Sequence, residues 1–153
     1  VDSQAAPLAR KLKQLGMNAQ LMGAGGFVSQ TFLTLAQREG EGVVALEPGL
    51  PLEQMPGGKA FEQAYRDRYH THIELHAPFA YDATRVLIAA IEQAGSANPA
   101  DYLPKLRAIH YQGVTGAIAF DAQGNLQQPS FTLYRVVDGK WQPQTVLGGD
   151  KTQ

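Results

Sequence analysis

The 153-residue chain contains no cysteine. Disulfide bonds, thiolate metal sites and cysteine nucleophiles are therefore excluded, while the compartment stays open because exported proteins can also lack cysteine. The 13 lysine and arginine residues are scattered and the net charge is −1, so we expect no nucleic-acid partner. No stretch approaches the roughly 20 consecutive apolar residues of a membrane-spanning helix.

A signal-peptide pattern is also lacking, because the chain opens directly with an amphipathic segment. We therefore expect the chain to be the mature or trimmed part of something longer. The composition that is present is ordinary for a globular protein. Hydrophobic residues make up 44% and charged residues 18%, which argues against disorder and suits one compact domain or two very small ones.

The first third of the chain alternates between helical and extended patterns. A short strand is expected over residues 18–23, and Ser29 is a good N-cap for a helix. The apolar run 42–49, closed by a proline, suits a buried parallel strand. This alternation is typical of an α/β domain. A helix ended by Gly16 is expected first, with one stripe formed by Leu8, Leu12 and Leu15.

A connector rich in proline and glycine follows at residues 48–58, and the next patterns are helical. One stripe contains Phe61, Tyr65 and Tyr69, and a second contains Ala80, Ala83, Leu87, Ile91 and Ala94. Asn98 as N-cap and Pro99 at the first position open a further helix, which Pro104 keeps short or kinked. The chain then turns to strands, with Asp138-Gly139 as a hairpin signal.

Three histidines and a glutamate occupy alternate positions in "HTHIELH": His70, His72, Glu74 and His76. On an extended chain all four would share one face, and such a set could bind zinc. The stretch lies between two helical patterns, however, and no H-E-x-x-H motif is present. The competing interpretation is a polar loop.

The stretch "MGAGGFVS" places glycines between a strand and a helix. Backbone N–H groups there could approach an anionic ligand, but neither a Walker loop nor a dinucleotide fingerprint is present. The alternative is a tight turn that needs positive φ angles. Nucleophile motifs are missing as well. Asp82 could pair with His76 as a dyad, yet it also suits the first turn of a helix.

Several segments together resemble the leucine/isoleucine/valine-binding proteins, which are type I periplasmic solute-binding proteins. The segments are "DSQAAPLARKLKQLGMNAQLMGAGGF", "EGVVALEP" and the closing section that holds "GVTGAIAFDAQGN" and "YRVVDGKW". The resemblance implies an α/β fold of two lobes with mostly parallel sheets flanked by helices. It also implies that this chain is a C-terminal half, whose missing N-terminal half is a partner. One lobe would hold residues 1–48 and 130–153, and the other residues 49–129.

The same resemblance implies where a ligand binds. The turn at Gly25, Gly26 and Phe27 would contact it, and His76 would contact its side chain, while His70 and His72 would lie on the surface. Family members that bind amino acids usually place an acidic residue in this turn, where Gly25 stands. Either the ligand's cation is bound by residues that precede this chain, or the ligand is not an ordinary amino acid.

The function implied is binding of a small polar ligand, an amino acid or a related small acid or amide, without catalysis or cofactor. The partners would be the membrane subunits of an ABC importer, in the periplasm or on the cell surface. The alternative is a metal-binding module or metal-dependent enzyme that uses the row from His70 to His76. A fragment with uncovered strand edges is expected to self-associate, by domain swapping through residues 48–56.

Overall fold

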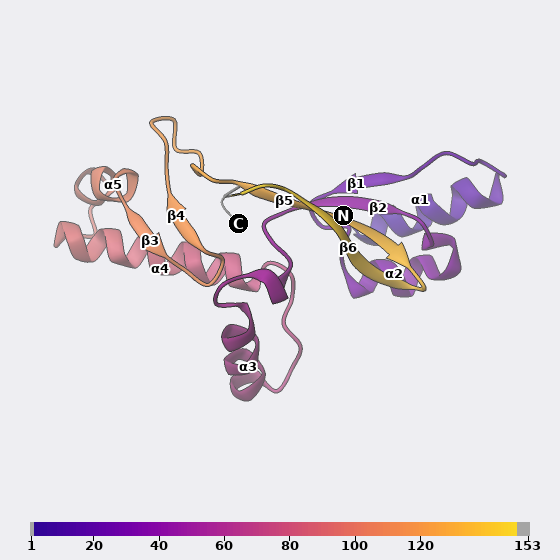
Figure 1. The fold of residues 1–153 in the computed structure, drawn as a ribbon, viewed down its shortest axis with the longest axis horizontal. Coiled ribbons are helices and arrows are strands. Elements are labelled where there is room, and N and C mark those ends of the chain that lie inside the picture. The colour runs from indigo at the N-terminus through magenta and orange to yellow at the C-terminus, as the bar shows by residue number, and fades with distance from the viewer. Residues whose placement is uncertain (1, 150–153) are drawn as a thin grey trace. The chain divides into compact units, whose positions relative to one another are not determined.

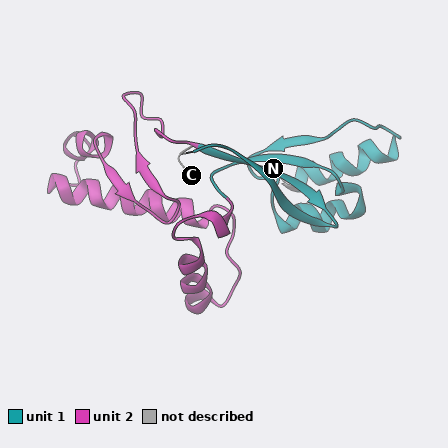
Figure 2. Ribbon diagram, viewed as in Figure 1, with its two compact units in different colours: residues 1–50, 130–151 teal, residues 51–129, 152–153 magenta. Residues whose placement is uncertain are grey.

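Residues 2–149 are described by a computed structural model, and within them the chain forms two compact units (Figures 1 and 2). Unit 1 comprises residues 2–50 and 130–149, and unit 2 comprises residues 51–129. Unit 1 is thus built from two separate stretches, with the whole of unit 2 inserted between them. Assigning the units to two lobes of a larger protein stays a proposal. Of the predicted first lobe, residues 1 and 150–153 lie outside the described residues.

Unit 1 contains a four-stranded sheet in the order β1-β2-β5-β6. The strands are β1 Met22–Ala24, β2 Val44–Pro48, β5 Ser130–Val137 and β6 Lys140–Gly148. The α/β class, with helices against a sheet, is confirmed. The described strands form a mixed sheet rather than a mostly parallel one. Among the described strands of this sheet, only β1 and β2 pair in parallel, because helical segments join them. A two-residue turn joins β5 to β6, and so short a connection requires the two strands to be antiparallel.

The core of unit 1 lies between the sheet and two helices, α1 Asp2–Gln14 and α2 Gln30–Ala36, the latter followed by the short helix η1 Gln37–Gly40. Its buried residues are Ala5, Ala6, Ala9, Phe32, Ala36, Val43 and Val136. The predicted leucine stripe is therefore wrong. Leu8 is 47% and Leu15 is 62% exposed. The buried face of α1 consists of alanines that pack against α2, because small side chains allow two helices to approach closely.

The predicted ends of elements in unit 1 are confirmed. Gly16 has φ 68°, and its N–H and that of Met17 donate to the carbonyls of Lys13 and Leu12, which ends α1. Asp138 and Gly139 have φ 51° and 68° and join β5 to β6, as their turn type requires.

Unit 2 is mainly helical. After the short helix η2 Leu52–Gln54 come α3 Gly58–Tyr69, α4 Ala77–Ala94 and α5 Pro99–Arg107. A two-stranded antiparallel sheet follows, formed by β3 His110–Gln112 and β4 Ala117–Ala119. The N-cap role of Asn98 is confirmed, since its side chain accepts from the N–H of Ala100. Strand β3 was not predicted. No described helix is long and apolar enough to cross a membrane.

The buried face of α4 differs from the predicted stripe. Its fully buried residues are Pro78, Asp82, Val86 and Ala90, whereas Ala80, Ala83 and Leu87 are exposed. Val86 and Ala90 pack with Ile109, and partly buried side chains of α5, β3 and β4 surround them. The prediction failed because a charged residue, Asp82, occupies the buried face.

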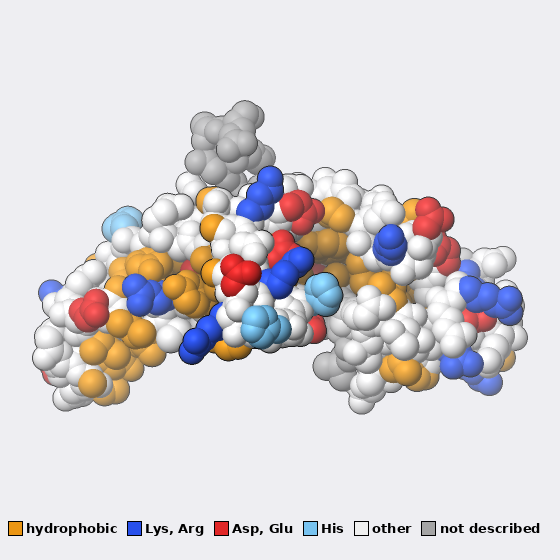
Figure 3. Space-filling model, turned by 90° about the horizontal axis from the view of Figure 1, so that it is seen from below, with side chains coloured by type: hydrophobic (Ala, Val, Ile, Leu, Met, Phe, Trp, Pro, Cys, Tyr) orange, Lys and Arg blue, Asp and Glu red, His pale blue; other side chains and the backbone are white. Residues whose placement is uncertain are grey.

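Large hydrophobic side chains remain exposed in both units (Figure 3). In unit 1 both helices contribute to a single core, on one face of the sheet. Phe131 and Leu147 are direct cross-strand partners and are 41% and 50% exposed. Their apolar area is therefore open to another part of a longer protein or to another chain.

Candidate functional site

The predicted ligand turn lies at the carboxyl ends of the two parallel strands. We call residues 25–29 the glycine turn; it connects the end of β1 to the start of α2. Strand β2 ends beside it, and the N–H of Gly25 donates to the carbonyl of Leu46 over 3.4 Å. In α/β folds, ligands characteristically bind beyond the carboxyl ends of parallel strands. The topology thus places this turn where a ligand site is expected.

Phe27 anchors the glycine turn to the core. A Cβ added at Gly23 would overlap the Phe27 ring, so the absence of a side chain at Gly23 makes room for that ring. Phe27 stacks on Phe32 with ring centres 6.0 Å apart, and Phe32 in turn contacts Trp141 at 5.3 Å. The ring of Phe27 is therefore part of the apolar packing of unit 1. Its predicted role as a ligand contact rests on its place in the turn.

Ser29 and Trp141 fix the other end of the glycine turn. The Ser29 Oγ accepts from the N–H of Phe32 over 3.0 Å, which confirms Ser29 as the N-cap of α2. The indole Nε1–H of Trp141 donates to the Ser29 carbonyl over 3.2 Å. Turn, helix and hairpin are thereby held as one body, which is the rigidity that a binding site needs.

Gly25 and Gly26 form the open part of the turn. Their φ angles are 22° and 91°, in the region that favours glycine, so the structural reason for glycine holds here. A Cβ placed on either residue would meet no atom within 4 Å. The backbone at these two residues is therefore accessible to an approaching group.

The N–H of Gly26 already has an acceptor within the protein. It donates to the Oε1 of Glu47, on β2, over 3.0 Å. Glu47 is only 1% exposed, and its Oε2 is buried without a hydrogen-bond partner among the described residues. A carboxylate thus occupies the position at which an anionic ligand would have contacted this N–H.

The four residues of the histidine row do not share a face. His70 ends α3 with φ 53°, and His76 precedes α4 with φ −89° and ψ −5°, so the segment is not an extended strand. All four side chains are exposed. Within residues 2–149, no group of three His, Cys, Asp or Glu side chains could hold a metal ion. The geometric premise of the zinc interpretation is therefore wrong.

Asp82 is a structural residue rather than a first-turn helix acid. It lies in the second turn of α4 and is 2% exposed. Its carboxylate accepts from the N–H of Val114 at 2.9 Å, and from the N–H and hydroxyl of Thr115 at 2.7 and 2.6 Å. These bonds attach the loop between β3 and β4 to α4. Its acceptors are committed to this loop, and no ion pair with His76 is found among the described residues.

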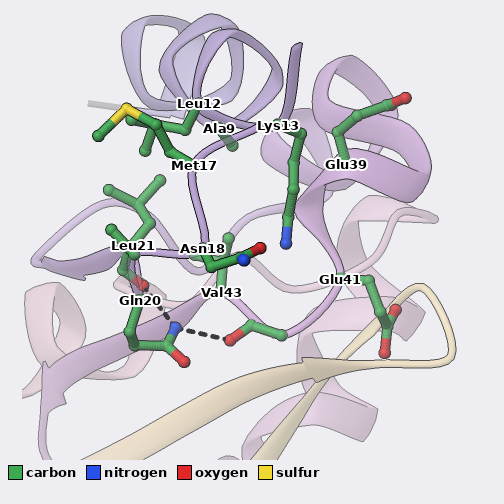
Figure 4. Close-up of a pocket in the computed structure, with 12 residues that line it drawn as sticks. Ala9, Leu12, Lys13, Met17, Asn18, Gln20, Leu21, Glu39, Glu41 and Val43 are labelled. Atoms are coloured by element: carbon green, nitrogen blue, oxygen red, sulfur yellow. Dashed lines mark hydrogen bonds between the residues drawn. The ribbon is translucent and has the colours of Figure 1, made fainter. Parts of the chain in front are cut away.

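A cavity of about 140 Å³ lies at the opposite ends of β1 and β2 (Figure 4). It is lined by residues that precede both strands, including Gln20 and Val43, and by Lys13 of α1. The Gln20 amide donates to the carbonyls of Leu21 and Gly42 at 3.0 and 2.8 Å, which closes one wall. The cavity is thus separate from the glycine turn.

Glu47 is the residue that reasoning from the sequence missed. The signal was present, since Glu47 is the single charged residue in the apolar run 42–49. An acid that interrupts a buried strand near its carboxyl end needs a partner. Its connection to Gly26, 21 residues earlier, becomes visible only once β1 and β2 are paired.

A sheet with helices packed against it, and a glycine turn at the carboxyl ends of its two parallel strands, place the chain in the class of α/β proteins whose fold offers a binding position there. The particular family follows from sequence comparison, because the family model described as "Periplasmic binding protein" matches residues 1–140. The chain belongs to the periplasmic binding protein family.

Two relatives identified by sequence comparison support this family membership. A leucine-, isoleucine-, valine-, threonine- and alanine-binding protein of Pseudomonas aeruginosa is 33% identical over 127 residues, covering 83% of this chain and 34% of that protein. A Leu/Ile/Val-binding protein homolog of Brucella melitensis is 26% identical over 137 residues, covering 87% of this chain and 36% of that protein. The chain therefore spans about a third of the length of these relatives.

Solved structures show the same fold. A leucine-binding protein from Thermotoga maritima has a TM-score of 0.83 and 23% identity, covering 95% of this chain and 42% of that chain. A putative branched-chain amino acid ABC transporter protein from Rhodospirillum rubrum has a TM-score of 0.71 and 27% identity, covering 94% and 42%.

Proposed function

We propose that this chain is part of a two-lobed solute-binding protein that binds a small polar ligand and delivers it to the membrane subunits of an ABC importer. The ligand is an amino acid or a related small acid or amide. The protein acts without catalysis, in the periplasm or on the cell surface. The observation that carries this proposal is the family match over residues 1–140, and the relatives named above support the ligand class.

In this proposal each compact unit belongs to one lobe, and each lobe contributes ligand contacts. Unit 1 is part of one lobe and unit 2 is part of the other, with crossings near residues 50 and 130. Gly25, Gly26 and Phe27 contribute ligand contacts from the first lobe, and His76 contributes one from the second. The remaining part of each lobe comes from a section of the protein that this chain does not contain.

Thermal unfolding of the complete binding protein tests the proposal. We expect leucine, isoleucine, valine, threonine or alanine to raise the Tm, because a ligand at a hundred times its Kd stabilises the native state by about 2.7 kcal/mol. His76→Ala should weaken binding about tenfold, the effect of one lost hydrogen bond to a charged or polar group. His70→Ala is the matched control and should leave the Kd unchanged.

The results that contradict the proposal are equally specific. No Tm change with any small amino acid, acid or amide would reject the binding function. Equal losses of affinity in the two histidine variants would remove His76 from the ligand site. Turnover of a small substrate that disappears in His76→Ala would show an enzyme instead.

A further inference from the structure

The sheet of unit 1 has a second face, which the described helices leave open. Both α1 and α2 contribute to the core on the first face, where Val136 of β5 is buried. Side chains of a strand alternate between the two faces. Along β5, Thr132, Tyr134 and Val136 are buried, whereas Phe131 and Leu133 in the alternate positions are exposed or partly buried. The side chains of Phe131 and Leu133 therefore belong to the second face.

A continuous row of hydrophobic side chains crosses this second face. Leu46 on β2 is the direct partner of Leu133 on β5, and Phe131 on β5 is the direct partner of Leu147 on β6. Met22 on β1 extends the row beyond Leu46 and is 57% exposed. We call these five residues the apolar band. An exposed apolar surface that continues over four strands marks an interaction site.

The charged strand residues on this second face are both basic. Arg135 follows Leu133 by two positions along β5, and Lys140 is the direct partner of Val137 at the end of the same face. The single acidic residue of the four strands, Glu47, lies on the first face, opposite Thr132. Within residues 2–149, neither Arg135 nor Lys140 forms an ion pair. The surface is therefore complementary to a partner that is both apolar and acidic.

Two observations favour the rest of the same protein over a second copy as this partner. Parallel strands of α/β proteins, such as β1 and β2, are characteristically covered on both faces. The chain covers 42% of each of the two solved structures named above, so more than half of those chains has no counterpart here. A second copy would bring its own basic face against this one in a symmetric pair, and like charges would oppose the contact.

We propose that the apolar band binds an amphipathic helix from the section of the protein that this chain does not contain. The apolar side of that helix lies on the band, and an acidic side chain of the helix pairs with Arg135. The inference rests on the part of the proposed function that makes this chain one section of a larger two-lobed protein. It adds which surface joins the two sections and what chemistry the joining segment has.

Cysteine labelling of the complete binding protein tests whether the apolar band is covered. Met22→Cys and Phe131→Cys each place a thiol in the band, and this chain contributes no cysteine of its own. Leu15→Cys is the matched control, because Leu15 is 62% exposed in the same unit and lies outside the sheet. We expect a maleimide to label both band thiols at least about a hundredfold more slowly than the control, because labelling must wait for local opening.

Other occupants of the band give different results, and each would overturn the inference. Labelling of the band thiols at the rate of the control would show that the band is open in the complete protein. Protection that disappears on dilution, together with a dimer in light scattering, would assign the band to a second copy. Protection that requires vesicles containing phosphatidylglycerol would assign it to an anionic membrane surface.

Charge substitutions at Arg135 test the acidic partner separately. Arg135→Glu should lower the Tm of the complete protein by roughly 2–4 °C, because the new carboxylate faces the acidic side chain of the helix. Arg135→Gln, which loses the pairing without adding repulsion, should fall between this variant and the unmodified protein. Arg10→Glu is the control, an exposed arginine on α1 whose substitution should change the Tm by no more than about 1 °C. Equal losses in the Arg135→Glu and Arg135→Gln variants would show that no acidic partner is present.

These measurements use no ligand, so their outcome is independent of what the protein binds. An open apolar band would reject the inference while a ligand that raises the Tm still supports the proposed function. Conversely, the failure of every small ligand to raise the Tm would reject the binding function while a protected band stands.

Discussion

Two buried acids, Asp82 and Glu47, differ in how their oxygens are used. Asp82 has donors on both oxygens and therefore stabilises a loop, whereas Glu47 has a donor on only one oxygen among the described residues. A carboxylate whose oxygens accept from backbone N–H groups is expected to stabilise the fold, whereas a carboxylate with an unpaired buried oxygen carries a desolvation cost that nothing offsets. Substitutions at the two positions should thus give opposite effects on stability.

Asp82→Asn should destabilise the protein by about 2–3 kcal/mol. The substitution replaces one carboxylate oxygen by an NH₂ group, so a buried backbone N–H of Val114 or Thr115 loses its hydrogen-bond acceptor. Chemical denaturation followed by circular dichroism measures this. Asp67→Asn is the matched control. Asp67 is an exposed acid of the same unit that accepts a hydrogen bond from the exposed Gln63 side chain, so the change should stay within about 0.5 kcal/mol. Equal effects in both variants would contradict the structural role of Asp82.

At the scale of elements, the turn after β4 is organised by Asp121. The carboxylate accepts from the N–H groups of Asn125 and Gln123 at 2.8 and 2.9 Å, and from the Asn125 amide at 3.2 Å. Hydrogen bonds from the Asn125 backbone and side chain, then from Gln123, lower the pKa of Asp121 below its ordinary value. The ionised form is therefore the one that holds this turn.

This lowered pKa predicts a pH dependence of the turn. A carboxyl group whose folded pKa lies below its unfolded value of about 3.9 stabilises the fold fully above that value, and the stabilisation is lost as the pH falls through the folded pKa. NMR titration should show the amide signals of Gln123 and Asn125 shifting below pH 4. Asp121→Asn should abolish that shift. A midpoint above 4 would contradict the assignment.

The elements that could be predicted are those whose signals lie in adjacent residues. Gly16 ends a helix, Asn98 begins one, and Asp138-Gly139 forms a hairpin, because each depends on local backbone geometry. The buried faces of α1 and α4 could not be predicted, because the packing partner of a helix decides which face is buried. The contacts of Glu47 and Asp82 reach across 21 and 32 residues, and no local pattern encodes them.

At the scale of the whole molecule, the exposed apolar residues are the main feature. β1 and β6 are the edges of the sheet in unit 1, and Leu147 lies on β6 next to Phe131, with both side chains exposed. Strand edges and apolar patches recruit other chains unless they are covered. Self-association of the isolated chain therefore stays a prediction, with β6 as the expected contact.

Multi-angle light scattering on the 153-residue chain tests this prediction. We expect dimers or larger species whose proportion rises with concentration. Leu147→Lys, which places a charge on the edge strand, should shift the distribution toward monomer while leaving the circular dichroism spectrum unchanged. A concentrated monomer of the unmodified chain that binds no hydrophobic dye would contradict the prediction.

The insertion of unit 2 within unit 1 has a consequence for biosynthesis. The ribosome releases β2 long before β5, its partner in the sheet, because all of unit 2 is made between them. Unit 2 is continuous, so its core around Val86, Ala90 and Ile109 can form as soon as it emerges. The apolar run from Val43 to Ala45 waits meanwhile without its antiparallel neighbour, and is the stretch of the nascent chain that a chaperone is most expected to protect.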